Sequence, residues 1–173
     1  TATVAPARSR PIRPATSLAS ATVLQAQDPA GVAIDRAVEA YAKVRTARAS
    51  FEQVAKQYPQ SAGAPGAYYY LGLLSLNQAT TAADLDDALA QFTRVQNLYP
   101  RSDWVPRALQ ATGLVHRRAG RLPEAVDASR RVFLEYPSSD AAAGAQFQVG
   151  QCLALLGEPR GAMEEFQQVR NRF

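Results

Sequence analysis

A tyrosine-proline motif returns along this chain at nearly constant spacing. Tyr-Pro-x-Ser begins at Tyr58, Tyr99 and Tyr136, and the steps from Tyr58 through these residues to the terminal Phe173 are 41, 37 and 37 residues. Self-similarity with a period of about 20–50 residues is typical of repeat architectures, in which each unit packs only on its neighbours. The sequence therefore predicts a stack of similar units.

The residues before each of these aromatics recur at the spacing of one helix face. Alanine stands eleven residues before the aromatic, phenylalanine or serine seven before it, and valine four before it. The four copies are Ala47, Phe51 and Val54; Ala88, Phe92 and Val95; Ala125, Ser129 and Val132; and Ala162, Phe166 and Val169. This spacing places one apolar stripe along a helix, so each copy predicts an amphipathic helix.

The residues after each tyrosine predict a second helix in every unit. Proline stops the preceding helix, serine three residues after the tyrosine is expected to cap the next one, and small residues allow close helix approach. These serines and small residues are Ser61, Ser102 and Ser139; Ala67, Ala108 and Ala145; and Gly72, Gly113 and Gly150.

Glycine marks the predicted turn inside two of the units. Gly120 and Gly157 suit a left-handed helix C-cap, and Pro123 and Pro159 follow at positions suited to the start of the next helix. In the first full unit, residues 77–87 replace this turn, and the sequence predicts an acidic surface loop or a helix extension there.

The beginning of the chain differs in composition from the repeats. Residues 1–27 hold three prolines and three basic residues, Arg8, Arg10 and Arg13, with no acid, which predicts an extended Pro/Ala/Arg-rich arm. Such an arm is either a solvated linker or a segment ordered by lying on another surface. We expect residues 28–60 to form a long N-terminal helix or half repeat and residues 61–173 to form the helical repeats.

Charge and hydropathy argue against two partner classes. The net charge is +4, but the arm supplies three of the 19 basic residues, which leaves 16 against 15 acidic residues in the rest. Nucleic acid is therefore not an expected partner. The sequence has no apolar run near the about 20 residues that a transmembrane helix needs, although peripheral association with a membrane stays open.

The sequence offers no recognisable catalytic, metal or cofactor site. Cys152 and His116 are the only residues of their types and are expected to serve packing or surface roles. The acidic cluster formed by Asp84, Asp86 and Asp87 lacks the glycine and the spaced ligands of a calcium loop and is expected at a solvated helix start. We therefore expect a non-catalytic protein.

These patterns resemble the tetratricopeptide repeat (TPR), which carries small or aromatic residues in a fixed order. Two units match this order, with Gly113, Ala125, Ser129, Val132 and Pro137 in one and Gly150, Ala162, Phe166 and Val169 in the other. The resemblance implies an all-α solenoid of helix-turn-helix units. The added residues between units, together with Tyr-Pro-x-Ser, most resemble bacterial envelope TPR proteins of the outer-membrane-assembly lipoprotein and Tol-Pal-associated periplasmic coordinator type.

The resemblance also implies a concave groove lined by the first helix of each unit. The residues expected to bind a partner there are Tyr69, Leu73, Arg107, Gln110, Leu114, Arg117, Arg118, Phe147 and Gln151. Such a groove would be apolar and aromatic at its ends with an arginine cluster in the middle, suited to a peptide or helix that carries an acid. Alternatively, Tyr69 and Phe147 only cover neighbouring repeats.

Three functions remain open from the sequence. The first is a scaffold or assembly subunit of a membrane-associated envelope complex on the periplasmic side of a bacterial membrane, with a cytoplasmic location not excluded. The second is a soluble adaptor or chaperone that holds peptides transiently. The third is a tether through the basic arm to an anionic lipid or nucleic acid.

Overall fold

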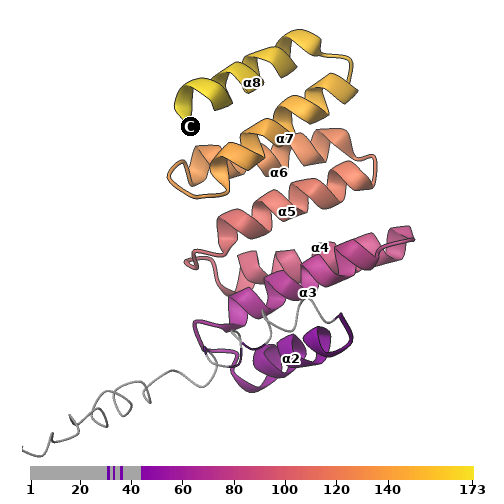
Figure 1. The fold of residues 1–173 in the computed structure, drawn as a ribbon, viewed down its shortest axis with the longest axis vertical. Coiled ribbons are helices and arrows are strands. Elements are labelled where there is room, and N and C mark those ends of the chain that lie inside the picture. The colour runs from indigo at the N-terminus through magenta and orange to yellow at the C-terminus, as the bar shows by residue number, and fades with distance from the viewer. Residues whose placement is uncertain (1–30, 32, 34–35, 37–43) are drawn as a thin grey trace, which may run out of the picture.

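The computed structural model describes residues 31, 33, 36 and 44–173, and the predicted arm lies outside the described residues. The described part is all helical and has no strand (Figure 1). Its helices are α2 (Val44–Gln57), α3 (Ala64–Gln78), α4 (Ala82–Leu98), α5 (Val105–Arg118), α6 (Leu122–Glu135), α7 (Ala142–Leu155) and α8 (Pro159–Arg172). The predicted all-α, TPR-like solenoid is therefore confirmed.

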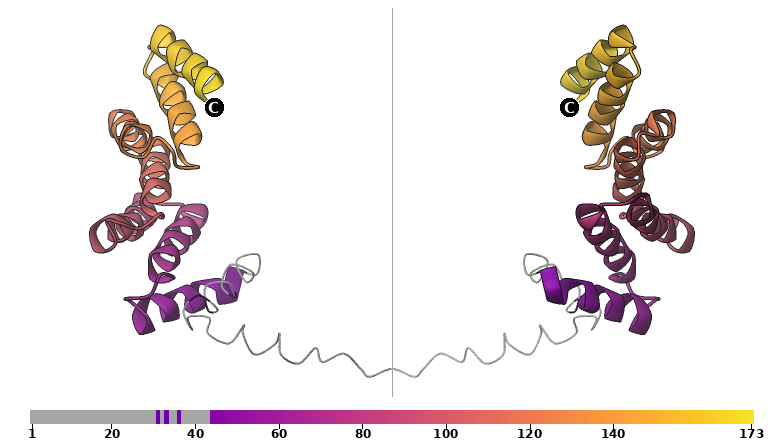
Figure 2. Two further views of the ribbon diagram at one scale, coloured as in Figure 1. Left: turned by 90° about the vertical axis from the view of Figure 1, so that its left-hand side faces the viewer. Right: turned by 90° about the vertical axis from the view of Figure 1, so that its right-hand side faces the viewer.

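Helices that follow one another in the chain are also neighbours in space. The pairs α3–α4, α5–α6 and α7–α8 form successive layers, and α2 packs on α3 at the N-terminal end of the stack (Figure 1). Only one kind of contact joins helices that are not consecutive: α3 contacts α5, and α5 contacts α7. Because the described helices α4, α6 and α8 make no such contacts with one another, α3, α5 and α7 line the inside of the curved stack (Figure 2).

The predicted apolar stripes form the core. Ala47, Phe51 and Val54 are at most 1% exposed, and the equivalent residues of α4 and α6 are completely buried. On α8 only Ala162 is buried. The reason is that no described helix covers the outer side of α8, where Met163 is 60% exposed.

The prediction that serine caps the following helix is wrong. The residues at the N-caps of α3, α5 and α7 are Gly63, Trp104 and Ala141, which make no side-chain cap hydrogen bond. The three serines stand two residues earlier and close the Tyr-Pro turn instead, because the backbone N–H of each donates to the tyrosine carbonyl at 2.9–3.0 Å. The serine backbone carbonyl then accepts from the first helical N–H at 3.0–3.2 Å.

The turns inside the units follow the sequence prediction. Gly120 and Gly157 have φ values of 74° and 82°, as expected for left-handed C-caps. In the first unit α3 and α4 extend to 15 and 17 residues, compared with 14 in the later helices. A capping box between Thr81 and Asp84 starts α4, so the predicted acidic insertion is mainly a helix extension.

Candidate functional site

The nine residues predicted to line a groove all lie on α3, α5 and α7. These helices form the inside of the curve, which agrees with the placement that the family resemblance implied. The side chains differ, however, in how much of each is committed to contacts within the chain. Their roles therefore have to be considered one region at a time.

At the N-terminal end of this inner surface, the aromatic side chains mainly contact one another. The Tyr69 ring lies 5.3 Å from the Trp104 ring and 5.8 Å from the Phe92 ring. Leu73 and Leu114 are partly buried against the core. This region consequently offers a firm, partly apolar surface that is already ordered by its own packing.

The predicted arginine cluster in the middle of the groove is divided among intramolecular partners. Arg118 donates to the carbonyl oxygens of Leu76 at 2.7 Å and Ala79 at 2.8 Å, and so satisfies the C-terminal end of α3. Arg107 binds Asp140 through two guanidinium nitrogens and lies 5.1 Å above the Trp104 ring. Of the three groove arginines, Arg117 is the one whose side chain has no hydrogen bond or ion pair with another described residue. The groove therefore has less available positive charge than the sequence predicts.

The C-terminal part of the inner surface is more open. Phe147 is 47% exposed, and its ring packs 5.1 Å from that of Phe166 on α8. Gln110 fills the space beside Gly144, where any Cβ atom would collide with the Gln110 amide. Gln151 lies one turn beyond Phe147 on the same helix and is partly buried. Phe147 is therefore the most accessible large apolar side chain among the nine.

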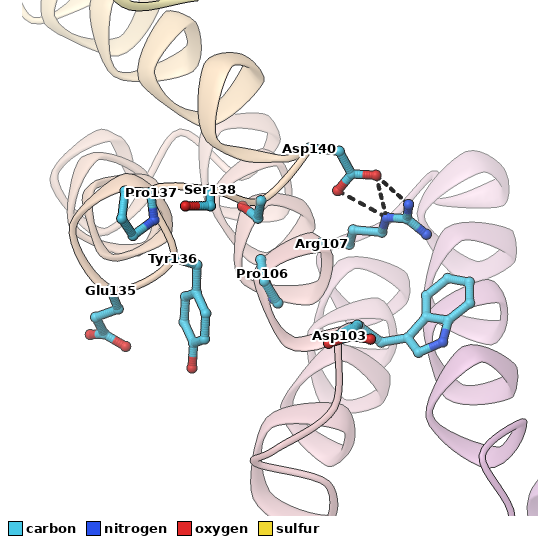
Figure 3. Close-up of a pocket in the computed structure, with 10 residues that line it drawn as sticks. Asp103, Pro106, Arg107, Glu135, Tyr136, Pro137, Ser138 and Asp140 are labelled. Carbon is cyan, nitrogen blue, oxygen red and sulfur yellow. Dashed lines mark hydrogen bonds and ion pairs between the residues drawn. The ribbon is translucent and has the colours of Figure 1, made fainter.

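Two pockets that sequence reasoning missed lie along the edge where the Tyr-Pro turns of successive units meet. The C-terminal turn pocket, between the turns at Tyr99 and Tyr136, has a volume of about 640 Å³ (Figure 3). The N-terminal turn pocket, between the turns at Tyr58 and Tyr99, has a volume of about 670 Å³. Asp103 and Trp104 line both pockets, so the two pockets are adjacent sites that share one wall.

The two pockets have a common construction. Each is lined by a Tyr-Pro pair and by the proline in the first turn of the preceding unit's first helix. These residues are Tyr136, Pro137 and Pro106 in the C-terminal turn pocket and Tyr99, Pro100 and Pro65 in the N-terminal one. The repeated Tyr-Pro and helix-starting proline were visible in the sequence, but nothing local showed that they would enclose a space.

Three carboxylates surround the C-terminal turn pocket. Arg107 lowers the pKa of Asp140 by its hydrogen bonds, and Glu135 accepts a hydrogen bond from Arg131 at 2.9 Å. The side chain of Asp103 makes no ion pair with any other described residue. Figure 3 shows Arg107 directed at Asp140 on one side and Tyr136 on the other side of the pocket. Asp103 is therefore the carboxylate that an incoming cation can bind without breaking an existing pair.

The two isolated titratable residues, His116 and Cys152, lie in partly buried and buried positions, respectively. Burial lowers the pKa of His116, with a further contribution from the positive charge of Arg121, and burial raises the pKa of the Cys152 thiol. No group of three metal-binding side chains is found among the described residues. None of the described helices is both long and apolar enough to cross a bilayer.

A curved stack of helix pairs with a continuous inner surface defines the class of helical-repeat proteins that bind other proteins. The profile of the tetratricopeptide repeat family matches residues 25–61, 67–102 and 145–173, which is more than half of the chain. The chain therefore belongs to the tetratricopeptide repeat family. The unit α5–α6 falls between the matched spans, although the structure shows the same helix pair there.

Solved structures show the same fold. A crystal structure of MamA matches with a TM-score of 0.66 and 18% identity over 88% of this chain and 83% of that one. A structure of MamA AMB-1 matches with a TM-score of 0.56 and 17% identity, covering 88% of this chain and 80% of the other. No match was found among curated protein sequences. At this identity the likeness shows the fold.

Proposed function

We propose that this protein is a non-catalytic scaffold or assembly subunit that docks on a larger membrane-associated complex of the bacterial envelope. The observation that carries the proposal is the inner surface of α3, α5 and α7, which has a self-packed aromatic region at its N-terminal end and the accessible Phe147 in its C-terminal part. A rigid surface with one exposed aromatic anchor suits protein binding, because little side-chain entropy is lost on association.

The groove chemistry favours a helix or extended segment with an apolar face and at least one acidic residue. Phe147 offers apolar area, Gln110 and Gln151 offer amide hydrogen bonds, and Arg117 offers a positive charge. The prediction that the arm, through Arg8, Arg10 and Arg13, also contacts a partner or an anionic surface stays part of the proposal.

The location on the periplasmic side of the membrane is a proposal that rests on the resemblance to envelope TPR proteins. It can be tested by adding protease to cells whose outer membrane has been permeabilised while the inner membrane stays intact. Digestion of the protein under conditions that leave a cytoplasmic marker intact supports the proposed location, whereas co-protection with that marker contradicts it.

The alternative function is a soluble adaptor or chaperone that holds peptide segments transiently in the same groove. A single experiment separates the two functions. The tagged protein is purified by affinity from native membranes in mild detergent, and the co-purifying proteins are identified by mass spectrometry. Stoichiometric membrane subunits support the docked scaffold. Recovery of scattered substoichiometric clients supports the adaptor.

Variants of single residues connect either result to the groove. Phe147→Glu and Arg117→Glu are expected to remove the co-purifying subunits. Leu134→Glu is the matched control, because Leu134 is 70% exposed but lies on α6, outside the inner surface. Loss of partners in the control alone, or retention in both groove variants, would show that the inner surface is not the docking site. Helical content measured by circular dichroism verifies that each variant is folded.

A further inference from the structure

The two turn pockets share a wall whose central side chain, Trp104, is held in place by contacts within the chain. Its ring lies 5.3 Å from that of Tyr69 and 5.6 Å from that of Tyr70, and the Arg107 guanidinium lies 5.1 Å from its centre. These contacts fix the indole before any ligand binds, so a ligand that packs against it costs little side-chain entropy. Trp104 is therefore a preformed contact surface for the occupant of either pocket.

The other apolar walls are formed by tyrosines, prolines and one leucine. The Tyr99 hydroxyl donates to the Pro59 carbonyl oxygen at 2.8 Å, which holds this tyrosine in the wall of the N-terminal turn pocket. Leu98 lines the same pocket and is 59% exposed. Grooves lined by aromatic side chains bind proline-containing segments, whose polyproline II conformation is ordered before binding. The walls therefore suit an extended, proline-containing ligand.

The two pockets differ in charge. The C-terminal turn pocket is lined by the carboxylates of Asp103, Glu135 and Asp140 and by one guanidinium, that of Arg107. The N-terminal turn pocket is lined by Arg101 and by the shared Asp103. The C-terminal pocket therefore favours a basic side chain, whereas Arg101 opposes a second basic side chain in the N-terminal pocket and favours an acidic one.

One charge of each sign is available to a ligand. Glu135 and Asp140 already accept hydrogen bonds from arginines of the chain. The side chains of Asp103 and Arg101 form no ion pair or hydrogen bond with any other residue that the structure describes. Because hydrogen bonds between ionised groups are stronger than those between neutral ones, these two side chains should select the ligand.

We propose that the two turn pockets bind an extended, proline-containing segment of a partner protein. A basic side chain of the segment binds Asp103 in the C-terminal turn pocket, and an acidic side chain binds Arg101 in the N-terminal turn pocket. The proline rings pack against Trp104 and the Tyr-Pro walls. This inference goes beyond the proposed scaffold function, because it concerns the turn edge of the stack and not the inner groove.

The geometry of the stack sets the spacing of the two charges in the ligand. The pockets begin at Pro65 and Pro106, in the first turns of α3 and α5, and these two helices are in contact. Packed helices lie about 8–10 Å apart. Three residues in polyproline II conformation advance by about 9 Å. A basic and an acidic residue three positions apart therefore match the step from one pocket to the next.

The test titrates the full chain with the acetylated and amidated peptide Pro-Pro-Arg-Pro-Pro-Glu-Pro-Pro. Trp104 is the single tryptophan of the chain and the peptide has no aromatic residue, so the emission of Trp104 reports binding at the shared wall. We expect a saturable change with a Kd below about 1 mM. The absence of saturation up to about 5 mM peptide would overturn the proposal.

Variants of the two charged residues test how the peptide is held. Asp103→Asn should weaken binding about tenfold, because a charge-assisted hydrogen bond is lost. Its matched control is Asp127→Asn, which makes the same change at an exposed position on α6 outside both pockets. Arg101→Gln should likewise weaken binding, and Arg160→Gln on α8 is its control. Equal affinities in each variant and its control would contradict the proposed contacts.

A matched peptide assigns the basic side chain to its pocket. The peptide with glutamine in place of arginine should bind the wild type and Asp103→Asn equally, because the contact that Asp103 makes is then already absent. A remaining difference between the two proteins would overturn the assignment. A Trp104 emission that changes on dilution of the protein alone would show that a second copy occupies the pockets, and would overturn the proposal.

The inner groove supplies the last control. Phe147→Glu should leave the affinity for the peptide unchanged, since Phe147 lines neither pocket. Loss of affinity in this variant would place the peptide in the groove and contradict the turn-edge site. Failure of this inference is thus distinguishable from failure of the groove proposal, which is measured by the co-purifying subunits.

Discussion

The units α3–α4 and α5–α6 have the same fold but differ in the side chains that pack between their two helices. In α3–α4 the completely buried Phe92 ring lies over Gly72, where an added Cβ would come within 2.5 Å of the ring. The pair Gly150–Phe166 repeats this arrangement in α7–α8. A glycine opposite a flat ring thus lets the two helices approach closely.

In α5–α6 the ring is missing, since Ser129 stands where the other units have phenylalanine. Gly113 there faces the Ser129 hydroxyl and the amide of Gln148 from α7. The Ser129 Oγ and Gln148 Nε2 atoms are buried and have no hydrogen-bond partner among the residues that the structure describes. Unsatisfied buried polar atoms cost free energy. The contact between Gly113 and Ser129 should therefore contribute less to stability than the contact between Gly72 and Phe92 in α3–α4. The helix pair therefore keeps its fold without the phenylalanine ring when a side chain from the next unit, here Gln148, packs in its place.

The largest test of this difference removes the ring. Phe92→Ala is expected to lower the free energy of unfolding by about 3–5 kcal/mol, because it leaves a cavity in a completely buried site. Urea unfolding followed by circular dichroism measures the change. A loss below about 1 kcal/mol would show that the ring is not the central contact of its unit.

Adding a methyl group to each glycine tests the closeness of the helices. Gly72→Ala is expected to cost about 1–3 kcal/mol, since the Phe92 ring must move. Gly113→Ala should cost less because the Ser129 hydroxyl and Gln148 amide can move more easily than a packed ring, although the Ala125 carbonyl oxygen lies 3.2 Å from the added atom. Combining Gly113→Ala with Ser129→Ala should recover part of the loss. An equal cost at both glycines would contradict the proposed difference.

The turns of the two units should respond differently to acid. Hydrogen bonds from the Thr80 and Thr81 backbone lower the pKa of Asp84 to about 2, compared with 3.8 unperturbed. The ionised Asp84 carboxylate therefore stabilises the folded state above pH about 4, and this stabilisation is lost as the pH falls toward 2. Asp84→Asn should remove this component of the acid dependence, measured by urea unfolding between pH 2 and 5.

The cap hydroxyl provides a test that does not rely on titration. Thr81→Ala should cost about 1 kcal/mol at neutral pH. The start of α6 has no side-chain cap hydrogen bond and supplies the comparison. An unchanged acid dependence in Asp84→Asn would mean that the capping box does not stabilise the first unit.

The smallest expected effect concerns the serine itself. Ser129→Ala removes a buried hydroxyl that has no partner in the described part of the chain, and it should leave the free energy of unfolding unchanged or raise it by up to about 1 kcal/mol. Thermal unfolding of the variant beside Gln148→Met would measure whether the polar pair weakens this unit. Clear destabilisation by Ser129→Ala would show that the hydroxyl is satisfied in solution.

Much of the fold could be predicted because its determinants are local. The stripe ending at Val54 and the C-cap at Gly120 follow from helical spacing and backbone preference, which act within a few residues. Ser139 departs from the sequence prediction, because its backbone closes the turn and its side chain does not cap α7. The groove has less available positive charge than the sequence predicts, because Arg118 binds carbonyl groups 39 and 42 residues away.

The sequence by itself determined the period of the stack, the identity of the core faces and the positions of the turns. These follow from short-range patterning, which any copy of the repeat carries. Only the tertiary structure decided which charges are already paired and where space remains, since Arg107 meets Asp140 from the next unit and the turn pockets exist only between two turns. Contacts between units depend on how the copies stack, and single-unit patterns do not encode that geometry.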